Sequence, residues 1–129
     1  MRGRVVADGS EALLPVRVFD PGLGGARADV RAVIDTGFTG HIALPARTVR
    51  SLALPELGSE ELVLADGTTE IATVHRATVE WHGRPRTVPV LAVGAEPLIG
   101  MALLAGSRLV MDAVPGGEVV LEERQGSNP

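Results

Sequence analysis

The stretch AVIDTGFTGHIALP, residues 32–45, decides how the rest of the chain is interpreted. In it an apolar run ends at Asp35, and Thr-Gly-Phe-Thr-Gly follows at once. One interpretation is a turn that ends a buried strand, because Asp and Gly are common turn residues. The other is a carboxylate delivered to the floor of a cleft, with glycines that let another segment approach closely. The apolar flanks of Asp35 predict that its side chain has low exposure.

The composition predicts one globular domain. The chain has 129 residues, of which 45% are hydrophobic and 22% are charged, enough for a single core but not for two. Because only 2% of the residues are aromatic, the core must consist mainly of Val, Leu, Ile and Ala. We expect a single domain over residues 1–129, with its core in residues 5–122 and a polar tail at residues 124–129.

Several function classes are disfavoured by the residue types present. The net charge is −4 and the arginines are scattered among acids, which argues against a nucleic-acid partner. There is no cysteine, and the spacing of His41, His75 and His82 matches no metal site. No cofactor is expected. No stretch resembles a signal peptide or a bilayer-spanning segment, so we expect a cytoplasmic protein with no membrane partner.

Most of the chain alternates polar and apolar residues with the period of two that is typical of half-buried strands. Strands are expected at residues 4–7, 13–20, 28–34, 41–45, 84–94, 108–112 and 117–123. Residues 60–83 predict a long hairpin whose tip, Asp66-Gly67, favours a tight type I′ turn. Short helices are expected at residues 45–54 and 101–105. The sum is a mainly β domain, closed or nearly closed on itself, with one or two short helices.

A second segment changes the interpretation of Asp35. Leu98 and Ile99 form another apolar pair, and Gly100 then leads into the second short helix. Together with VIDTG at residues 33–37 and a hairpin at residues 60–74, this order resembles the retropepsin-like (clan AA) aspartic proteases, of the bacterial single-domain type. The resemblance spans residues 5–122. It implies an all-β, single-lobed acid-protease fold, a closed β-barrel or sandwich.

The resemblance also implies roles for individual residues. Those implied to be catalytic are Asp35, Thr36 and Gly37. Those implied to contact substrate are Phe38, Thr39, Gly40, Ala65, Asp66, Gly67 and Thr68. Those implied to support the catalytic loop are Leu98, Ile99 and Gly100. Viral members commonly carry Asp and Arg where this chain has Thr39 and Met101, so the viral substrate preference does not carry over.

A single chain is incomplete as an aspartic protease. Hydrolysis needs two carboxyl groups that share one proton, and the chain contains one Asp-Thr-Gly. The resemblance therefore implies a homodimer in which Asp35 faces Asp35 of a second copy across a two-fold axis. It also implies that terminal strands at residues 4–7 and 119–122 interleave with those of the partner, and that the hairpin folds over an extended peptide.

Three functions remain open from the sequence. The first is an aspartic endopeptidase that hydrolyses extended peptides or proteins through a water activated by the paired Asp35 carboxyl groups. The second is a dimeric peptide-binding module that has the same fold without turnover. The third is a β domain in which Asp35 is only a structural turn, and this third interpretation predicts a monomer.

Overall fold

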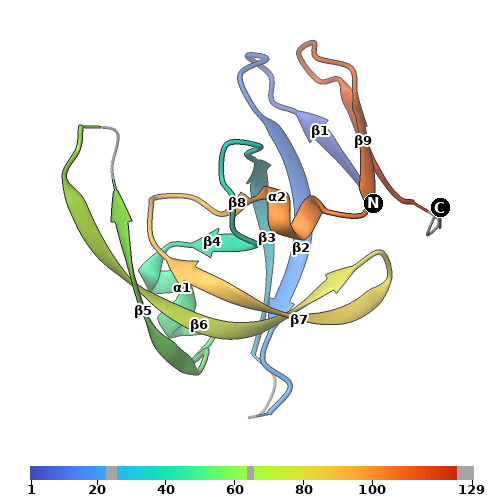
Figure 1. Cartoon of the computed structure of the whole chain (residues 1–129). Helices are drawn as coiled ribbons and strands as arrows, with labels where there is room; N and C mark the ends of the chain where they lie inside the picture. Colours follow the sequence, from blue (N-terminus) through green and yellow to red (C-terminus); the bar gives the residue numbers. More distant parts are fainter. Residues whose placement is uncertain (23–25, 64–65, 125–129) are drawn as a thin grey trace, which may run out of the picture.

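The computed structural model describes residues 1–22, 26–63 and 66–124. These residues form a mainly β structure with two short helices (Figure 1). The elements in chain order are β1 (Arg2–Val5), β2 (Ala12–Phe19), β3 (Arg27–Ile34), β4 (Ile42–Leu44), α1 (Ala46–Ser51), β5 (Glu56–Val63), β6 (Thr69–Trp81), β7 (Arg84–Ala92), β8 (Leu98–Ile99), α2 (Met101–Leu104), β9 (Ser107–Met111) and β10 (Glu118–Glu123).

The sheet closes into a barrel. Its strand order is β5-β6-β7-β4-β8-β3-β2-β1-β10-β9, and β2 pairs additionally with β6 through Val18–Val79 and Phe19–Thr78. The strands from β6 through β2 therefore form a ring, in which strand edges are paired rather than exposed. The prediction of an all-β structure closed on itself, with one or two short helices, is confirmed.

The core has the aliphatic composition that the low aromatic content predicts. In β2 the alternate residues Ala12, Leu14, Val16 and Val18 are buried, as a half-buried strand requires. Opposite them the barrel is filled mainly by aliphatic side chains of other strands, with Trp81 as the one buried aromatic ring among the described residues. The largest side chains that are fully buried are Leu14, Ile42, Leu44, Ile99, Leu103 and Leu121.

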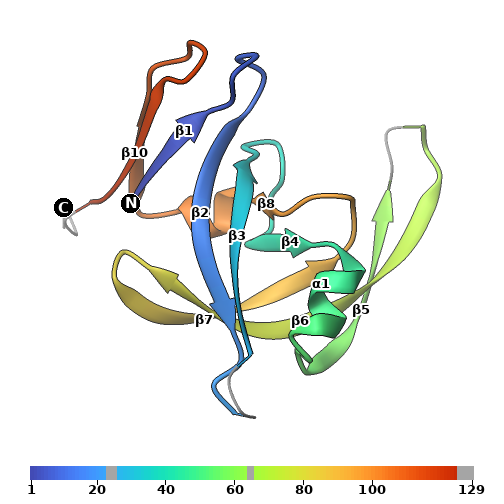
Figure 2. The same cartoon turned by 180° about the vertical axis from the view of Figure 1, so that it is seen from behind.

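The hairpin β5–β6 projects from one side of the barrel (Figures 1 and 2). It is longer than residues 60–74, because β6 runs for 13 residues and continues into the barrel wall. Val63 pairs with Thr69, so residues 64–68 separate the two strands. The prediction of a two-residue turn at Asp66-Gly67 is therefore wrong. A two-residue turn with positive φ at both positions instead joins β6 to β7, at His82 (φ 52°) and Gly83 (φ 77°).

The terminal strands lie on the side opposite the hairpin (Figure 2). β1 pairs with β2 on one edge and with β10 on the other, and β10 pairs in turn with β9. Both edges of β1 and of β10 are thus occupied within one chain. β9 is the outer strand at this end of the sheet, and interleaving of the terminal strands with those of a partner stays a prediction.

The two helices are short and lie beside the barrel. α1 begins directly after Pro45 and buries Val49, and α2 begins after Gly100. Proline suits the start of a helix because its missing N–H has no helical partner there. Across the described parts of the chain, no helix is long and apolar enough to cross a membrane.

Candidate functional site

Asp35 is the first residue after β3, and a neighbouring strand fixes its backbone. β8 pairs in parallel with β3 through Val33–Leu98 and Ile34–Ile99. The Asp35 N–H then continues this ladder by donating to the Ile99 carbonyl oxygen at 2.9 Å. Because β8 also pairs with β4, Asp35 stands at the end of central strands and not at a free sheet edge.

The loop after β3 begins with a turn around the Asp35 side chain. Asp35 Oδ1 accepts the Gly37 N–H at 3.0 Å, and the Asp35 carbonyl oxygen accepts the Phe38 N–H at 3.1 Å. The turn interpretation of Asp-Thr-Gly is therefore correct for the local backbone. Asp35 is half-buried in the single chain, more exposed than its apolar flanks predict, and Thr36 and Gly37 are exposed.

The segment that begins at Gly100 packs against this loop and forms hydrogen bonds with its backbone. Gly100 N–H donates to the His41 carbonyl oxygen at 3.0 Å, and Met101 N–H donates to the Phe38 carbonyl oxygen at 2.8 Å. A Cβ at Gly100 would lie 2.6 Å from the Phe38 ring and closer still to the Gly40 carbonyl oxygen. Only glycine fits such an approach without displacing backbone. The two sequence segments that suggested the resemblance are in direct contact.

A groove of about 380 Å³ lies between this loop and the hairpin. Its walls are mostly apolar, and its lining residues are Gly37, Phe38, Thr39, Gly40, His41, Ile42, Glu60, Leu62, Val74, Pro89 and Leu91. The loop residues expected to contact substrate, Phe38, Thr39 and Gly40, are among them. The volume of the groove lies in the range of known ligand pockets.

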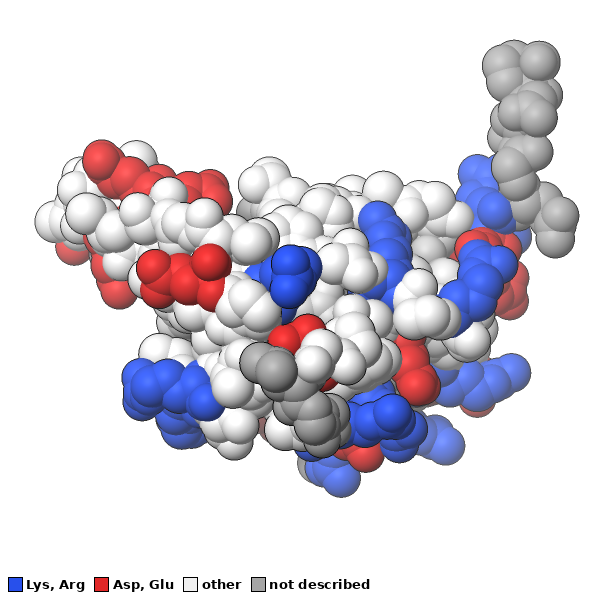
Figure 3. All heavy atoms as spheres, turned by 90° about the horizontal axis from the view of Figure 1, so that it is seen from below, with Lys and Arg blue, Asp and Glu red and all other residues white. Residues whose placement is uncertain are grey.

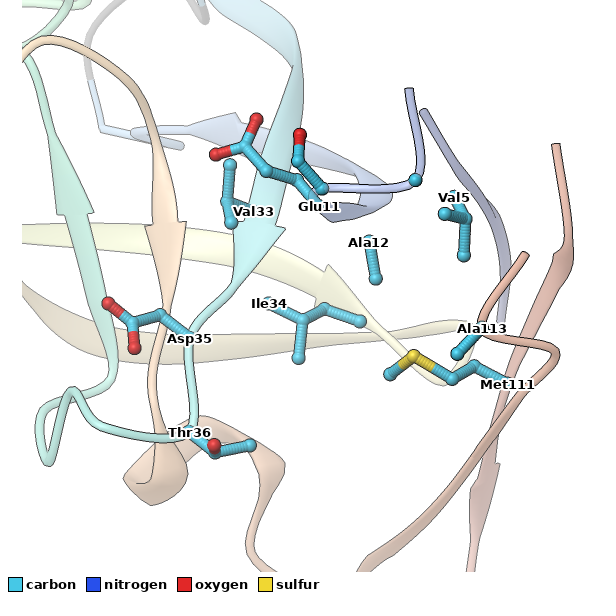
Figure 4. Close-up of a pocket in the computed structure, with 11 residues that line it drawn as sticks. Val5, Glu11, Ala12, Val33, Ile34, Asp35, Thr36, Met111 and Ala113 are labelled. Atoms are coloured by element: carbon cyan, nitrogen blue, oxygen red, sulfur yellow. The ribbon is translucent and has the colours of Figure 1, made fainter. Parts of the chain in front are cut away.

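A second pocket of about 380 Å³ lies on the other side of the loop and includes Asp35 and Thr36. Its remaining lining residues come from β1, the β1–β2 connection, β2, β3, β9 and the residues after β9, and they are Val5, Gly9, Ser10, Glu11, Ala12, Val33, Ile34, Met111 and Ala113. Figure 4 shows Asp35 and Glu11 at this pocket, with their carboxylates apart from each other. Burial, and then the charge of Glu96, raise the pKa of Glu11.

The hairpin tip lies apart from the groove. Of the residues expected to contact substrate there, Asp66, Gly67 and Thr68 do not line it, and Ala65 lies outside the described residues. Asp66 Oδ1 accepts both the N–H (2.9 Å) and the hydroxyl (2.6 Å) of Thr68, and these bonds lower the pKa of Asp66.

The hairpin instead contributes Glu60, Leu62 and Val74 to the groove wall, and the sequence analysis missed all three. Counting alternate residues back from a correctly placed tip would have identified them, because such residues share one face of a strand.

Two of the three histidines have structural partners for their side chains. His75 is buried, with Nδ1 2.9 Å from the Leu54 carbonyl oxygen and Nε2 2.9 Å from the Thr73 hydroxyl. His82 Nε2 lies 2.8 Å from the Ser107 hydroxyl. In residues 1–22, 26–63 and 66–124, no three His, Cys, Asp or Glu side chains are grouped so that they could hold a metal ion.

Comparison with known proteins finds little similarity in sequence. No protein-family model and no curated protein matches this chain. Among solved structures, the chain is similar to the solution structure of the Simian Foamy Virus (mac) protease, with a TM-score of 0.49 and 17% sequence identity. The alignment covers 70% of this chain and 91% of the viral one.

Proposed function

We propose that the chain is an aspartic endopeptidase that acts on extended peptides as a homodimer, with Asp35 of each copy in the catalytic pair. One observation carries the proposal: the half-buried Asp35 carboxylate stands at the end of a central strand, with its backbone bonded to Ile99. The segment at residues 98–100 thus fixes the Asp35 backbone and supports the loop that follows it.

The reaction requires two carboxyl groups in close contact. One is ionised and takes a proton from water while that water attacks the peptide carbonyl carbon. The other is protonated and donates a hydrogen bond to the carbonyl oxygen, so negative charge is stabilised as it develops. Two carboxyl groups in close contact share one proton, because both cannot be ionised together. The pKa values that are measured therefore describe the pair and not either residue alone.

The second carboxyl group comes from a second copy in this proposal. Asp66 stands on the projecting hairpin, away from the groove, and its carboxylate is already bonded to Thr68. Met111 of β9 lines the Asp35 pocket and is an exposed apolar side chain, and Val114 after β9 is exposed as well. A second copy packed there would bury this apolar surface and bring the two Asp35 loops together.

Sedimentation of the pure protein at micromolar concentration tests the assembly. A dimer is expected, and a monomer at every concentration would overturn the catalytic pair. Cleavage is tested with a peptide library between about pH 3 and 8, with and without a statine-type inhibitor. We expect cleavage that the inhibitor blocks.

The peptide-binding module makes a different prediction in the same assays. A module binds peptides as a dimer but cleaves none of them, and Asp35→Asn then has no activity to remove. An enzyme loses turnover in Asp35→Asn while the variant keeps its affinity for peptide. If the wild type binds peptides without cleaving them, the chain is a peptide-binding module and the endopeptidase proposal is wrong.

A further inference from the structure

The groove beside the Asp35 loop has one carboxylate in an otherwise mainly apolar wall. That carboxylate belongs to Glu60 of β5, and Leu62 and Val74 of the hairpin lie in the same wall. Phe38 and Leu91 line the groove from the loop and from β7. A side chain entering it would contact apolar surface along its length and meet a carboxylate at the hairpin.

The pairing of β5 with β6 places Glu60 on the inner face of the hairpin. Glu60 is opposite Ala72, and Leu62 is opposite Glu70. Directly opposed residues, and alternate residues along a strand, share one face of a sheet. Glu60 therefore shares the groove-facing side with Leu62 and Glu70. Its neighbour Glu61 points to the other side, opposite Ile71, which is 74% exposed.

The carboxylate of Glu60 is available to a ligand. None of the ion pairs formed by the described residues involves Glu60 or Glu70. The sequence from residue 51 to residue 75 contains no Arg or Lys, and Figure 3 shows acidic side chains gathered on the projecting hairpin. The hairpin thus contributes a negative field that is not neutralised locally.

Two basic groups, His41 and Arg86, lie at or near the groove. His41 is the one histidine among the residues that line it. Burial, and then the positive charge of Arg86, lower the pKa of His41, so its ring is neutral at pH 7. Arg86 itself does not line the groove. At neutral pH the charged group of the groove lining is Glu60.

We propose that Glu60 is a specificity-determining residue that selects peptides with a Lys or Arg side chain in this groove. These side chains combine an apolar stem with a terminal cation, which matches apolar walls and a carboxylate at the hairpin. This proposal rests on the proposed peptide hydrolysis and names its substrate class. An uncharged apolar side chain of the same length fills the groove but leaves Glu60 without a partner.

Matched peptides test the proposal with the 129-residue chain. A peptide cleaved from a random library is scanned with lysine and then with norleucine at each position, because norleucine keeps the apolar stem without the cation. For the wild type we expect at least one position at which lysine raises kcat/KM roughly three- to fivefold over norleucine, the range for a solvent-accessible ion pair. Raising the salt concentration should reduce this ratio.

The variant Glu60→Gln should reduce the lysine-to-norleucine ratio to about one, because the side chain keeps its shape and loses its charge. Glu61→Gln is the matched control: it removes the same charge from the next residue, on the opposite face. It should leave the ratio within about a factor of two of the wild type. The proposed role of Glu60 is wrong if the lysine-to-norleucine ratio is unchanged in Glu60→Gln, or if it falls equally in both variants. Neither result would contradict the proposed hydrolysis.

A binding measurement separates this proposal from the hydrolytic one. In Asp35→Asn, the dissociation constants of the same two peptides should differ in the same direction as in the cleavage assay. If the lysine peptide binds more tightly but the wild type cleaves nothing, the endopeptidase proposal is wrong and the proposed selection by Glu60 remains valid. If no peptide binds and none is cleaved, both proposals fail.

Discussion

The turns at Asp35 and at Asp66 follow the same local rule in different surroundings. In each, an aspartate Oδ1 accepts the N–H of the residue two positions later, Gly37 at 3.0 Å and Thr68 at 2.9 Å. At Asp66 the Thr68 hydroxyl donates to the same oxygen. Gly37 has no side chain, so Asp35 receives only the backbone bond from that residue.

The surroundings, and not the turn, distinguish the two aspartates. The backbone of Asp35 is bonded to Ile99 of a distant segment, and Gly100 packs under the following loop. Asp66 belongs to the end of an exposed hairpin. A turn motif therefore fixes the position of a carboxylate relative to its own backbone, whereas contacts with distant segments fix its position in the molecule.

The largest expected difference between the two turns is in catalysis. Asp35→Asn removes the carboxylate that we propose accepts a proton from water, and it should lower kcat/KM by about 10³-fold or more. Asp66→Asn alters an exposed turn and should change kcat/KM by less than about threefold. Steady-state cleavage of one peptide by both variants measures the contrast, and similar losses would show that Asp35 has no special role.

The next largest effect is expected on the free energy of unfolding, because the Asp35 loop is packed against Gly100 and the hairpin is more open. Gly100→Ala forces a Cβ against the Phe38 ring and the Gly40 carbonyl oxygen, and should lower the free energy of unfolding by about 2 kcal/mol. The control Gly58→Ala lies in the hairpin, where a Cβ meets nothing within 4 Å, and should stay within about 0.5 kcal/mol of the wild type. Urea unfolding of both variants decides whether the Asp35 loop is the more tightly packed region.

A smaller effect is expected from making the Asp35 turn resemble the Asp66 turn. Gly37→Ser introduces a hydroxyl that can donate to the Asp35 carboxylate, as Thr68 does to Asp66. Such a bond stabilises the ionised form and should lower kcat/KM about tenfold, because the catalytic pair must share a proton. Gly37→Ala adds the Cβ without the hydroxyl. Equal losses of kcat/KM in the two variants would show that the size of the added side chain, and not its hydroxyl, causes the effect.

The smallest effect is at Asp66 itself. Hydrogen bonds from Thr68 lower the pKa of Asp66, so Thr68→Val should raise it towards the ordinary value of an aspartate. A depressed folded-state pKa contributes stability above the unfolded-state pKa, and that contribution is lost as the pH falls through the folded value. Carboxyl NMR titration of the wild type and the variant measures the shift, and an unchanged pKa would mean that the hydroxyl bond is absent in solution.

The fold could be predicted from the sequence where local periodicity determines it. Strands expected at residues 13–20 and 84–94 occur at Ala12–Phe19 and Arg84–Ala92, because alternation defines a buried and an exposed face. The partner of β1 could not be predicted in this way. β10 lies more than a hundred residues later, and no local pattern specifies which strands pair.

The candidate site was predicted in part for the same reason. Asp35 and the segment at Gly100 were identified because each has a short sequence signature. Glu60 was missed because its direction depends on the register of β5, which the loop between Val63 and Thr69 sets. A tip misplaced by one residue is enough to exchange the inner and outer faces of a strand.

The bond between the Asp35 N–H and the Ile99 carbonyl oxygen has a consequence for the order of synthesis. When the ribosome has completed residue 97, the whole Asp-Thr-Gly sequence exists, but β8, which fixes its direction, does not. A nascent or truncated chain of that length carries the motif without a positioned carboxylate. Under the proposed function, such a fragment should not hydrolyse peptides.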